Sequence, residues 1–387
     1  MSRLSETSCA RTRRVSSLVS SSVPATSFAA RPGFVADDST GVAAHFGNPL
    51  VEQRALLSGS AVVQVPSRGL VTVSGPDRLS WLDSLTSQSL KSLAPGSSTE
   101  TLLLDPSGRV EHAAGVLDDG ETTWLLVDAA EAESFAAWLD RMRFMLRVEV
   151  ADRSADFAVL GSFADLALPA ASPAGIPLVW IDPWHEVAVG GVGYAAEAGH
   201  PAADWSYRET LVTAESLADV AASEVPVAGA LALEALRVAA WRPRLATEVD
   251  ERSIPHELDW LRSAVHLAKG CYRGQETVAK VHNLGHPPRR LVMLHLDGSD
   301  NVLPGHGDVV RKGDREVGSI TSSGTHYELG PIALALVKRS LDVTAPLTVL
   351  AGDDDTVVAA AQQTIVPPDA GAAAGVPRLP RLGAVRR

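Results

Sequence analysis

Cysteine is scarce in this sequence, which has only Cys9 and Cys271 among its 387 residues. Two cysteines cannot form a disulfide framework, so we expect a reducing, cytoplasmic compartment. Long apolar runs are also missing, because no stretch approaches the ~18 consecutive apolar residues of a membrane span. A formal net charge of −12 disfavours general binding to nucleic acid or to an anionic membrane. We therefore expect no direct nucleic-acid partner and no membrane partner.

Several common catalytic motifs are absent as well. The sequence has no G-x-G-x-x-G after a strand, no Walker A loop, no G-x-S-x-G and no H-E-x-x-H. Nucleotide-binding, hydrolase and metalloprotease interpretations therefore have no support. Cys271, His282 and His286 have C-x10-H-x3-H spacing, but a zinc finger needs a second cysteine. We predict no metal site.

What is present points to a chain of several domains. A length of 387 residues and a hydrophobic content of 45% suit two or three domains with real cores. Both ends are basic and of low complexity, and the composition of the first 40 residues would also suit an organellar transit peptide. The predicted divisions are a disordered extension (1–43), an N-terminal α+β lobe (44–151), a second α+β lobe (152–287), a C-terminal β-barrel (288–367) and a disordered tail (368–387).

The periodicity of apolar residues supports these divisions. Strand-like and helix-like segments alternate up to Pro287-Pro288, which indicates a mixed α+β fold. After these prolines the helical patterns stop. Short strands at turn-rich spacing follow and predict a small β-barrel or sandwich.

The stretch "KGCYRGQETVAKVHNLGHPPRR" surrounds Cys271. Gly270 and Gly274 permit a tight backbone path with positive φ. The segment 275–284 predicts a helix, which places Cys271 just before a helix N-terminus. Free amide groups at such an end lower a thiol pKa and bind anions.

The charge of this stretch supports an anion site. Residues 269–290 contain one acid, Glu276, against five basic side chains, within an otherwise acidic body. An anionic small molecule is one partner that this charge suits. A solvated helix with ordinary surface charge is the alternative. The basic residues are Lys269, Arg273, Lys280, Arg289 and Arg290.

A second candidate lies on the predicted helix "LALEALRVAAW". Glu234 and Arg237 have i,i+3 spacing, and Trp241 follows one turn later. Such a row could line a pocket for an aromatic, carboxylated ligand. A surface ion pair beside a core tryptophan is the alternative interpretation.

The octapeptide "KGCYRGQE" (Lys269–Glu276) resembles the K-G-C-[FY]-x-G-Q-E motif of the YgfZ proteins, a folate-binding branch of the glycine-cleavage T-protein superfamily. Segments such as "VGSITSSGTHYELGPIALALVKR" resemble the T-protein barrel, and the likeness covers roughly residues 44–366. It implies a three-lobed fold, with two intertwined α+β lobes and a small C-terminal β-barrel around a hole for tetrahydrofolate. It also implies support of iron–sulfur cluster assembly or repair, and so of tRNA-modifying enzymes, with cluster proteins or assembly factors as partners.

The resemblance assigns roles to the candidate residues. Cys271 becomes the reactive thiol, as a catalytic candidate. The glutamate tail of a folate suits Lys269, Arg273 or Arg237, its pterin can stack on Tyr272 or Trp241, and Glu234 can accept hydrogen bonds from the pterin. The predicted folate-binding set is Lys269, Gly270, Tyr272, Arg273, Gly274, Gln275, Glu276, Glu234, Arg237 and Trp241.

One departure from the T-protein pattern bears on catalysis. Aminomethyltransferases of the superfamily carry an aspartate pair in a segment like G-G-x-x-D-D, where this chain has Glu111 and His112. Catalytic placement tolerates little displacement, so the longer glutamate disfavours aminomethyl transfer. A folate-dependent one-carbon transferase and a non-catalytic, folate-regulated scaffold remain the alternatives.

Overall fold

The computed structural model describes residues 27–37, 40–299, 301–352 and 354–375. The predictions for residues 1–26, with Cys9, and for 376–387 lie outside these ranges. Part of the predicted disordered extension is ordered: strands β1 (Val35–Ala36) and β2 (Ala43–His45) pair with each other. Phe28 and Val42 are buried, because their apolar side chains join the core of the protein.

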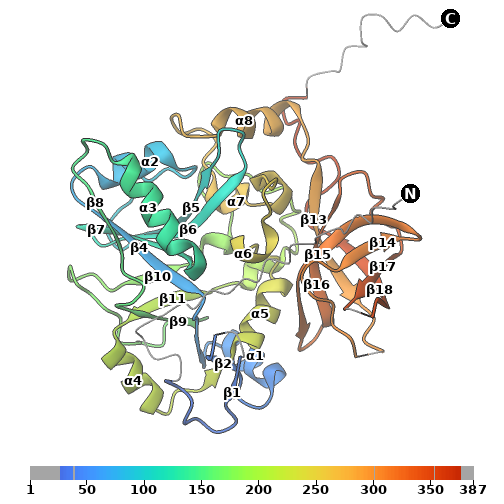
Figure 1. Cartoon of the computed structure of the whole chain (residues 1–387), viewed down its shortest axis with the longest axis horizontal. Helices are drawn as coiled ribbons and strands as arrows, with labels where there is room; N and C mark the ends of the chain where they lie inside the picture. The colour runs from blue at the N-terminus through green and yellow to red at the C-terminus, as the bar shows by residue number, and fades with distance from the viewer. Residues whose placement is uncertain (1–26, 38–39, 300, 353, 376–387) are drawn as a thin grey trace, which may run out of the picture.

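The first α+β lobe is an antiparallel sheet with strand order β5-β6-β7-β4-β8 (Figure 1). Helices α2 and α3 cover one face, where Trp81 and Phe135 pack against alternate strand residues such as Val71. The elements are β4 (Arg68–Ser74), α2 (Arg78–Leu85), β5 (Ser98–Leu104), β6 (Val110–Asp118), β7 (Thr122–Asp128), α3 (Ala132–Met142) and β8 (Glu149–Asp152).

The second lobe contains a strand from before the first lobe. Its sheet has the order β10-β11-β9-β3-β12, in which β3 pairs with β9 and, in parallel, with β12. The two lobes are therefore intertwined, as the resemblance implied, and no single cut near residue 151 separates them. The elements are α1 (Pro49–Leu57), β3 (Val62–Gln64), β9 (Ala158–Ser162), β10 (Val179–Ile181), β11 (Arg208–Val212), α4 (Ala214–Ala222), β12 (Val227–Ala228) and α5 (Ala230–Ala239).

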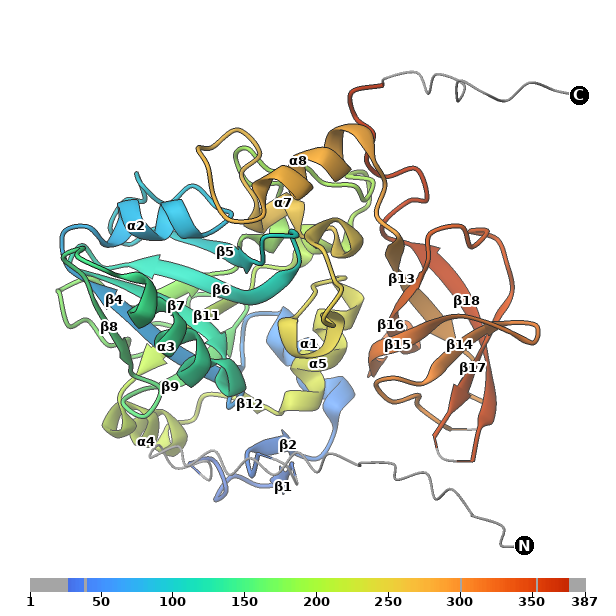
Figure 2. The same cartoon turned by 45° about the horizontal axis from the view of Figure 1, so that its top comes forward.

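The chain between α5 and the barrel forms short helical segments. Helix α8 begins at Gln275 and ends at Leu284, as the sequence predicted, and Gly285 follows with an extended backbone. Figure 2 shows α8 above α7, between the sheets and the barrel. The segments are α6 (Leu245–Glu248), η4 (Pro255–Leu258), α7 (Leu261–Ala264) and α8 (Gln275–Leu284). No helix in the described ranges is long and apolar enough to span a membrane.

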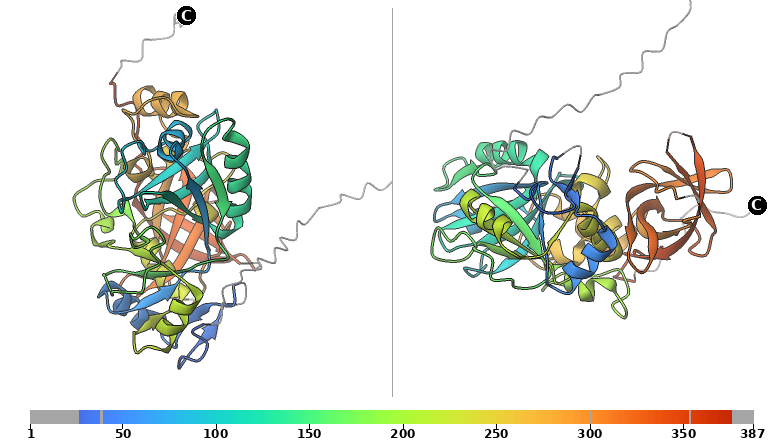
Figure 3. Two further views of the ribbon diagram at one scale, coloured as in Figure 1. Left: turned by 90° about the vertical axis from the view of Figure 1, so that its left-hand side faces the viewer. Right: turned by 90° about the horizontal axis from the view of Figure 1, so that it is seen from below.

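The C-terminal domain is a closed barrel with strand order β13-β16-β15-β14-β17-β18, set to one side of the sheets (Figures 1 and 3). Along β13, Val292 and Leu294 point into the barrel core, while Leu291 and Met293 pack against the core of the other lobes. The strands are β13 (Arg289–Leu296), β14 (Val309–Lys312), β15 (Arg315–His326), β16 (Gly330–Lys338), β17 (Leu347–Ala351) and β18 (Thr356–Thr364).

Ion pairs tie the barrel to the acidic loop that precedes the cysteine stretch. The guanidinium of Arg289, at the start of β13, lies 2.6 Å from Asp250 and 2.8 Å from the fully buried Glu257. Burial raises the pKa of Asp250, but hydrogen bonds from Arg289 and Ser253 hold it well below its usual range. Arg289 thus acts at a domain junction, although the sequence counted it in an anion site.

Three buried titratable groups predict a specific pH dependence. Burial lowers the pKa values of His200 and His256 to about 4 and raises that of Asp259 to about 7. On acidification from pH 7 to 5, the histidines become protonated mainly in the unfolded chain, so they lower stability. Asp259 binds its proton first in the folded protein and raises stability. Between pH 7 and pH 5, we expect the free energy of unfolding of Asp259→Asn to fall by about 2 kcal/mol more than that of the wild type, as measured by urea unfolding.

Asparagine is the suitable replacement because Asp259 has a left-handed backbone, with φ 55°, which asparagine tolerates. The comparison uses the change between the two pH values, so a constant loss of stability in the variant does not affect it. Parallel pH profiles for the two proteins would mean that Asp259 is ionised in the folded state.

Candidate functional site

A cavity of about 420 Å³ lies between the two sheets and helix α5. The first sheet contributes strands β4 to β7, the second contributes β3, β10 and β11, and the segment after α5 closes one side. Six acidic and four arginine side chains line it, together with several aromatic rings. A lining of this kind suits a flat ligand that carries many hydrogen-bond donors.

The aromatic rings come from Trp180, Trp205, Tyr207 and Trp260. Trp180 donates its indole N–H to the carbonyl oxygen of Thr99, at 2.7 Å. Its ring lies against Gly115, where a Cβ atom would come within 2.7 Å of the ring. Because residue 115 of β6 is a glycine, the ring of Trp180 can pack against the strand and form part of the cavity wall.

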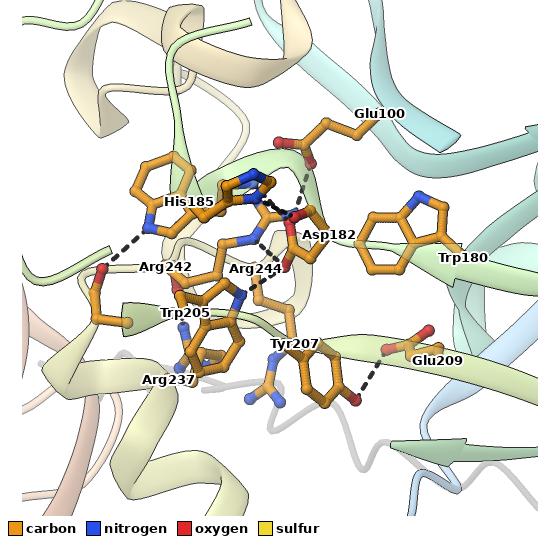
Figure 4. A network of polar contacts seen from close by, with 12 residues as sticks. Glu100, Trp180, Asp182, His185, Trp205, Tyr207, Glu209, Arg237, Arg242 and Arg244 are labelled. Atoms are coloured by element: carbon orange, nitrogen blue, oxygen red, sulfur yellow. Dashed lines mark hydrogen bonds and ion pairs between the residues drawn. The ribbon is translucent and has the colours of Figure 1, made fainter. Parts of the chain in front are cut away.

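A buried network around Arg242 holds the inner wall together (Figure 4). Arg242 donates from Nε to Asp182 at 2.9 Å and from Nη2 to Glu100 at 2.7 Å. The indole N–H groups of Trp205 and Trp260 donate to the same carboxylates. One cation thus fixes two acids and two rings, which come from segments far apart in the sequence.

Glu234 and Arg237 line the cavity, in the predicted i,i+3 arrangement. All the N–H groups of Arg237 are directed at protein acceptors: Glu234, Glu248, Ser322 and the carbonyl oxygen of Arg242. Arg237 therefore orients Glu234 and has no donor left for a ligand.

Glu234 is an acid at the cavity surface that stays ionised. Burial raises its pKa, but Arg237 and Arg244 overcome this effect and lower the pKa to about 2. About a quarter of its side-chain surface is accessible. Glu234 can therefore accept hydrogen bonds from a ligand at any physiological pH.

The cysteine turn lies outside the cavity, because none of residues 269–276 is among its lining. Lys269 is the clearest case. Its ammonium group donates to the carbonyl oxygens of Asp83, Thr86 and Gln88 at the end of α2, and its side chain is 2% accessible. These contacts occupy the amine, so Lys269 stabilises the fold rather than offering a charge to an anion.

The two glycines of the turn have different roles. Gly274 has φ 84°, and a Cβ atom there would lie 2.7 Å from the carbonyl oxygen of Asp105. Gly270 does not have a positive φ, and a Cβ atom there would meet nothing within 4 Å. The expectation of positive φ therefore holds for Gly274 alone. Cys271 is exposed, four residues before α8.

Arg273 and Tyr272 also have partners within the fold. Arg273 forms an ion pair with Glu111 of β6 and lies over the ring of Trp138. Tyr272 is buried under the ammonium of Lys269, and burial raises its pKa to about 12. The anion site predicted from the charge of this turn thus has two of its cations, Lys269 and Arg273, in internal contacts.

The remaining predicted residues lie apart from the cavity. Gln275 donates to the carbonyl oxygen of Lys269, and Glu276 is exposed on α8. Trp241 is buried in a left-handed conformation and directs its indole N–H to the sulfur of Met293, at 3.3 Å. Trp241 therefore packs between the lobes and the barrel instead of facing the cavity.

The sequence did not reveal most residues of the cavity wall. Arg68, Glu100, Trp180 and Glu209 are single residues on separate strands, and no motif joins them. Only "AWRPR", after α5, placed two arginines close to Glu234 in the sequence. Polar residues within otherwise apolar strand patterns are the signal that could have found the others.

Comparison with known proteins matches two family models in order along the chain. Residues 45–269 match the GCVT N-terminal domain, and residues 289–365 match the glycine cleavage T-protein C-terminal barrel domain. The fold agrees with the crystal structure of glycine cleavage system aminomethyltransferase T from Bartonella henselae. The TM-score is 0.66 at 16% identity, and the alignment covers 87% of this chain and 94% of that one.

Curated relatives carry different names. An iron–sulfur cluster assembly factor IBA57 homolog, mitochondrial, from Mycosarcoma maydis is 28% identical over 60% of this chain and 56% of its own length. A putative chloroplastic transferase of Arabidopsis thaliana is 26% identical over 79% of this chain and 71% of its own. An aminomethyltransferase of Nostoc is 27% identical over 77% of this chain and 82% of its own length.

The N-terminal family model alone spans more than half of the chain, and the barrel model covers the domain that the structure shows as a closed barrel. This protein therefore belongs to the YgfZ/GcvT superfamily, the family of the glycine cleavage T-proteins.

Proposed function

We propose that this protein binds tetrahydrofolate in the cavity and supports the assembly or repair of iron–sulfur clusters, and through them tRNA-modifying enzymes. The observation that carries the folate part is the cavity itself, with aromatic walls and an ionised, accessible Glu234. A reduced pterin is flat and has several N–H donors, so it matches a wall of rings and carboxylates.

Unsatisfied polar atoms in the lining also support a polar ligand. Gln64 Oε1, Glu100 Oε1, Arg242 Nη1 and Arg244 Nε are buried and have no hydrogen-bond partner in the described ranges. Two of these atoms accept and two donate. Groups of this kind are normally satisfied by a ligand or a bound water, and a folate supplies both donors and acceptors.

The cluster-related part rests on the relatives and on the cysteine turn. The M. maydis relative is named as an iron–sulfur cluster assembly factor, and this chain keeps an exposed Cys271 in its "KGCYRGQE" turn. The partners would be iron–sulfur proteins or assembly factors that contact this turn. The location would be a reducing compartment, cytoplasmic or, as for the two organellar relatives, within an organelle.

Aminomethyl transfer receives less support from the geometry. Glu111 is paired with Arg273, and His112 lies 2.6 Å from Glu131. Neither residue lines the cavity. The segment that would carry the aminomethyltransferase aspartates therefore does not present a carboxylate to a ligand there, which favours a binding or scaffold role.

Anaerobic titration with tetrahydrofolate tests the folate part. We expect a saturable change in tryptophan fluorescence, because Trp180, Trp205 and Trp260 line the cavity. Glu234→Gln should weaken binding about tenfold, since it removes a charged acceptor. Glu276→Gln, an equivalent change in the exposed turn, should have little effect. No saturable change, or loss of binding in the Glu276 variant alone, would contradict the placement of the ligand.

A Cys271→Ser variant tests the thiol separately. Because Cys271 lies outside the cavity, we expect its tetrahydrofolate affinity to equal that of the wild type. In a strain that lacks the gene, we expect the variant to fail to restore the activity of iron–sulfur enzymes. Full restoration would show that the backbone of the turn, and not the thiol, is what the cluster-related role needs.

A further inference from the structure

Arg68 is the cavity arginine with the most unused hydrogen-bonding capacity. It begins β4, and about a fifth of its side-chain surface is accessible. Its Nε donates to both carboxylate oxygens of Glu209, at 2.9 and 3.0 Å. Glu209 is held in turn by the hydroxyl of Tyr207, at 3.1 Å. Two other side chains of the wall therefore set the position of this guanidinium.

Within the described part of the chain, the two terminal nitrogens of Arg68 have no hydrogen-bond acceptor. Neither donates a hydrogen bond to any described residue. The guanidinium carbon lies over the Trp180 ring, 5.7 Å from its centre, so an aromatic surface adjoins the cation. A planar pair of N–H donors is the geometry that binds a carboxylate through two parallel hydrogen bonds.

The other cavity arginines have fewer free donors than Arg68. Arg237 has no donor left, and Arg242 uses two of its nitrogens on Asp182 and Glu100, so that only its buried Nη1 is without a partner in the described ranges. Both terminal nitrogens of Arg244 are directed at Glu234. Because acids outnumber arginines in the lining, an anionic group is stabilised only where a cation has unpaired donors.

From this arrangement we infer that Arg68 binds a carboxylate of the ligand, beside Trp180, and so selects ligands that carry an anionic tail over those with the ring alone. This inference rests on the proposed function in taking the ligand to be a folate, whose glutamate tail supplies the carboxylate. Arg68 thus takes the place of Lys269, Arg273 and Arg237, which the sequence suggested as binding residues for that tail. Glu209 and Tyr207 act as positioning residues for Arg68.

The neighbouring acids do not remove the charge of Arg68. Burial lowers its pKa, but Glu209 and Asp128 together raise it above the ordinary value, so the guanidinium stays protonated. In Figure 4, Glu209 lies on the side of the cluster away from Arg237, whose helix carries the hydrogen-bond acceptor Glu234. The cavity thus has an acceptor group and a carboxylate-binding group on different walls, which suits an elongated ligand.

Three probes separate the tail from the ring: tetrahydrofolate, 6-methyltetrahydropterin, which lacks the tail, and p-aminobenzoylglutamate, which lacks the pterin. Their dissociation constants would be measured by anaerobic calorimetry for the wild type, Arg68→Gln, Arg68→Gln/Glu209→Gln and Arg244→Gln. The single variant leaves buried Glu209 without its cation. The double variant also removes the charge of Glu209, so the test stays valid if the single variant unfolds. Thermal melting checks the fold of each.

We expect both Arg68 variants to bind tetrahydrofolate and p-aminobenzoylglutamate about tenfold more weakly and 6-methyltetrahydropterin as the wild type does. Equal weakening of all three probes, no weakening, or a tail-dependent loss confined to Arg244→Gln would overturn the inference and leave folate binding intact. If the wild type binds p-aminobenzoylglutamate through Arg68 but neither pterin, the proposed function fails and the inference stands. Binding of none of the probes overturns both.

Discussion

Replacing Arg242 with methionine should lower the free energy of unfolding by about 3–5 kcal/mol. Arg242 is buried and compensates two carboxylates, Glu100 and Asp182, that are 4% and 3% accessible. Methionine keeps much of the apolar volume but leaves two nearly buried acids without a cation. Chemical denaturation at pH 7 measures the loss of stability.

Arg147→Met is the matched control for this prediction. Arg147 also binds a carboxylate, Asp77, through two nitrogens, but its side chain is 73% accessible. Water solvates both groups when such a pair is broken, so we expect a much smaller change. Similar losses in the two variants would show that the Arg242 network is hydrated and that burial does not set its strength.

Gly274→Ala should destabilise the protein by about 2–4 kcal/mol, whereas Gly270→Ala should have little effect. The φ of 84° at Gly274 is strained for alanine, and the new Cβ would meet the backbone of Asp105 at 2.7 Å. That contact joins the cysteine turn to the hairpin between β5 and β6. At Gly270 neither obstacle exists, so the two glycines of one motif form an internal comparison.

Urea unfolding of the two alanine variants measures this difference. The same variants also show which glycine the function needs. If Gly270→Ala folds as the wild type does but fails to support iron–sulfur enzymes, Gly270 serves a partner rather than the fold. Equal stability of the two variants would mean that the turn can move away from Asp105.

Much of the fold follows from local patterns. Helix 275–284 was predicted correctly, with its end before Gly285 and Pro287, because helix formation and termination depend on nearby residues. The change from helical to strand patterns after Pro288 likewise located the barrel, whose first strand begins at Arg289. The intertwining of the lobes came from the resemblance alone, since β3 joins a sheet whose other strands start about 95 residues later.

The candidate site was predicted less well. Glu234 and Arg237 do line the cavity, because their spacing on one helix places them together. The count of charges in the cysteine turn could not show that the Lys269 amine caps α2 or that Arg273 pairs with Glu111. Those partners come from other parts of the chain, and a charge is available to a ligand only when no such partner takes it.

The sequence by itself determined the types of the elements, the position of the barrel and the superfamily, because periodicity and a contiguous motif carry that information. Tertiary structure alone decided which polar groups are free. Arg68 and Glu209 are 141 positions apart, yet their contact leaves two guanidinium nitrogens beside Trp180. Burial and long-range pairing set the availability of charge, and neither is a property of a short segment.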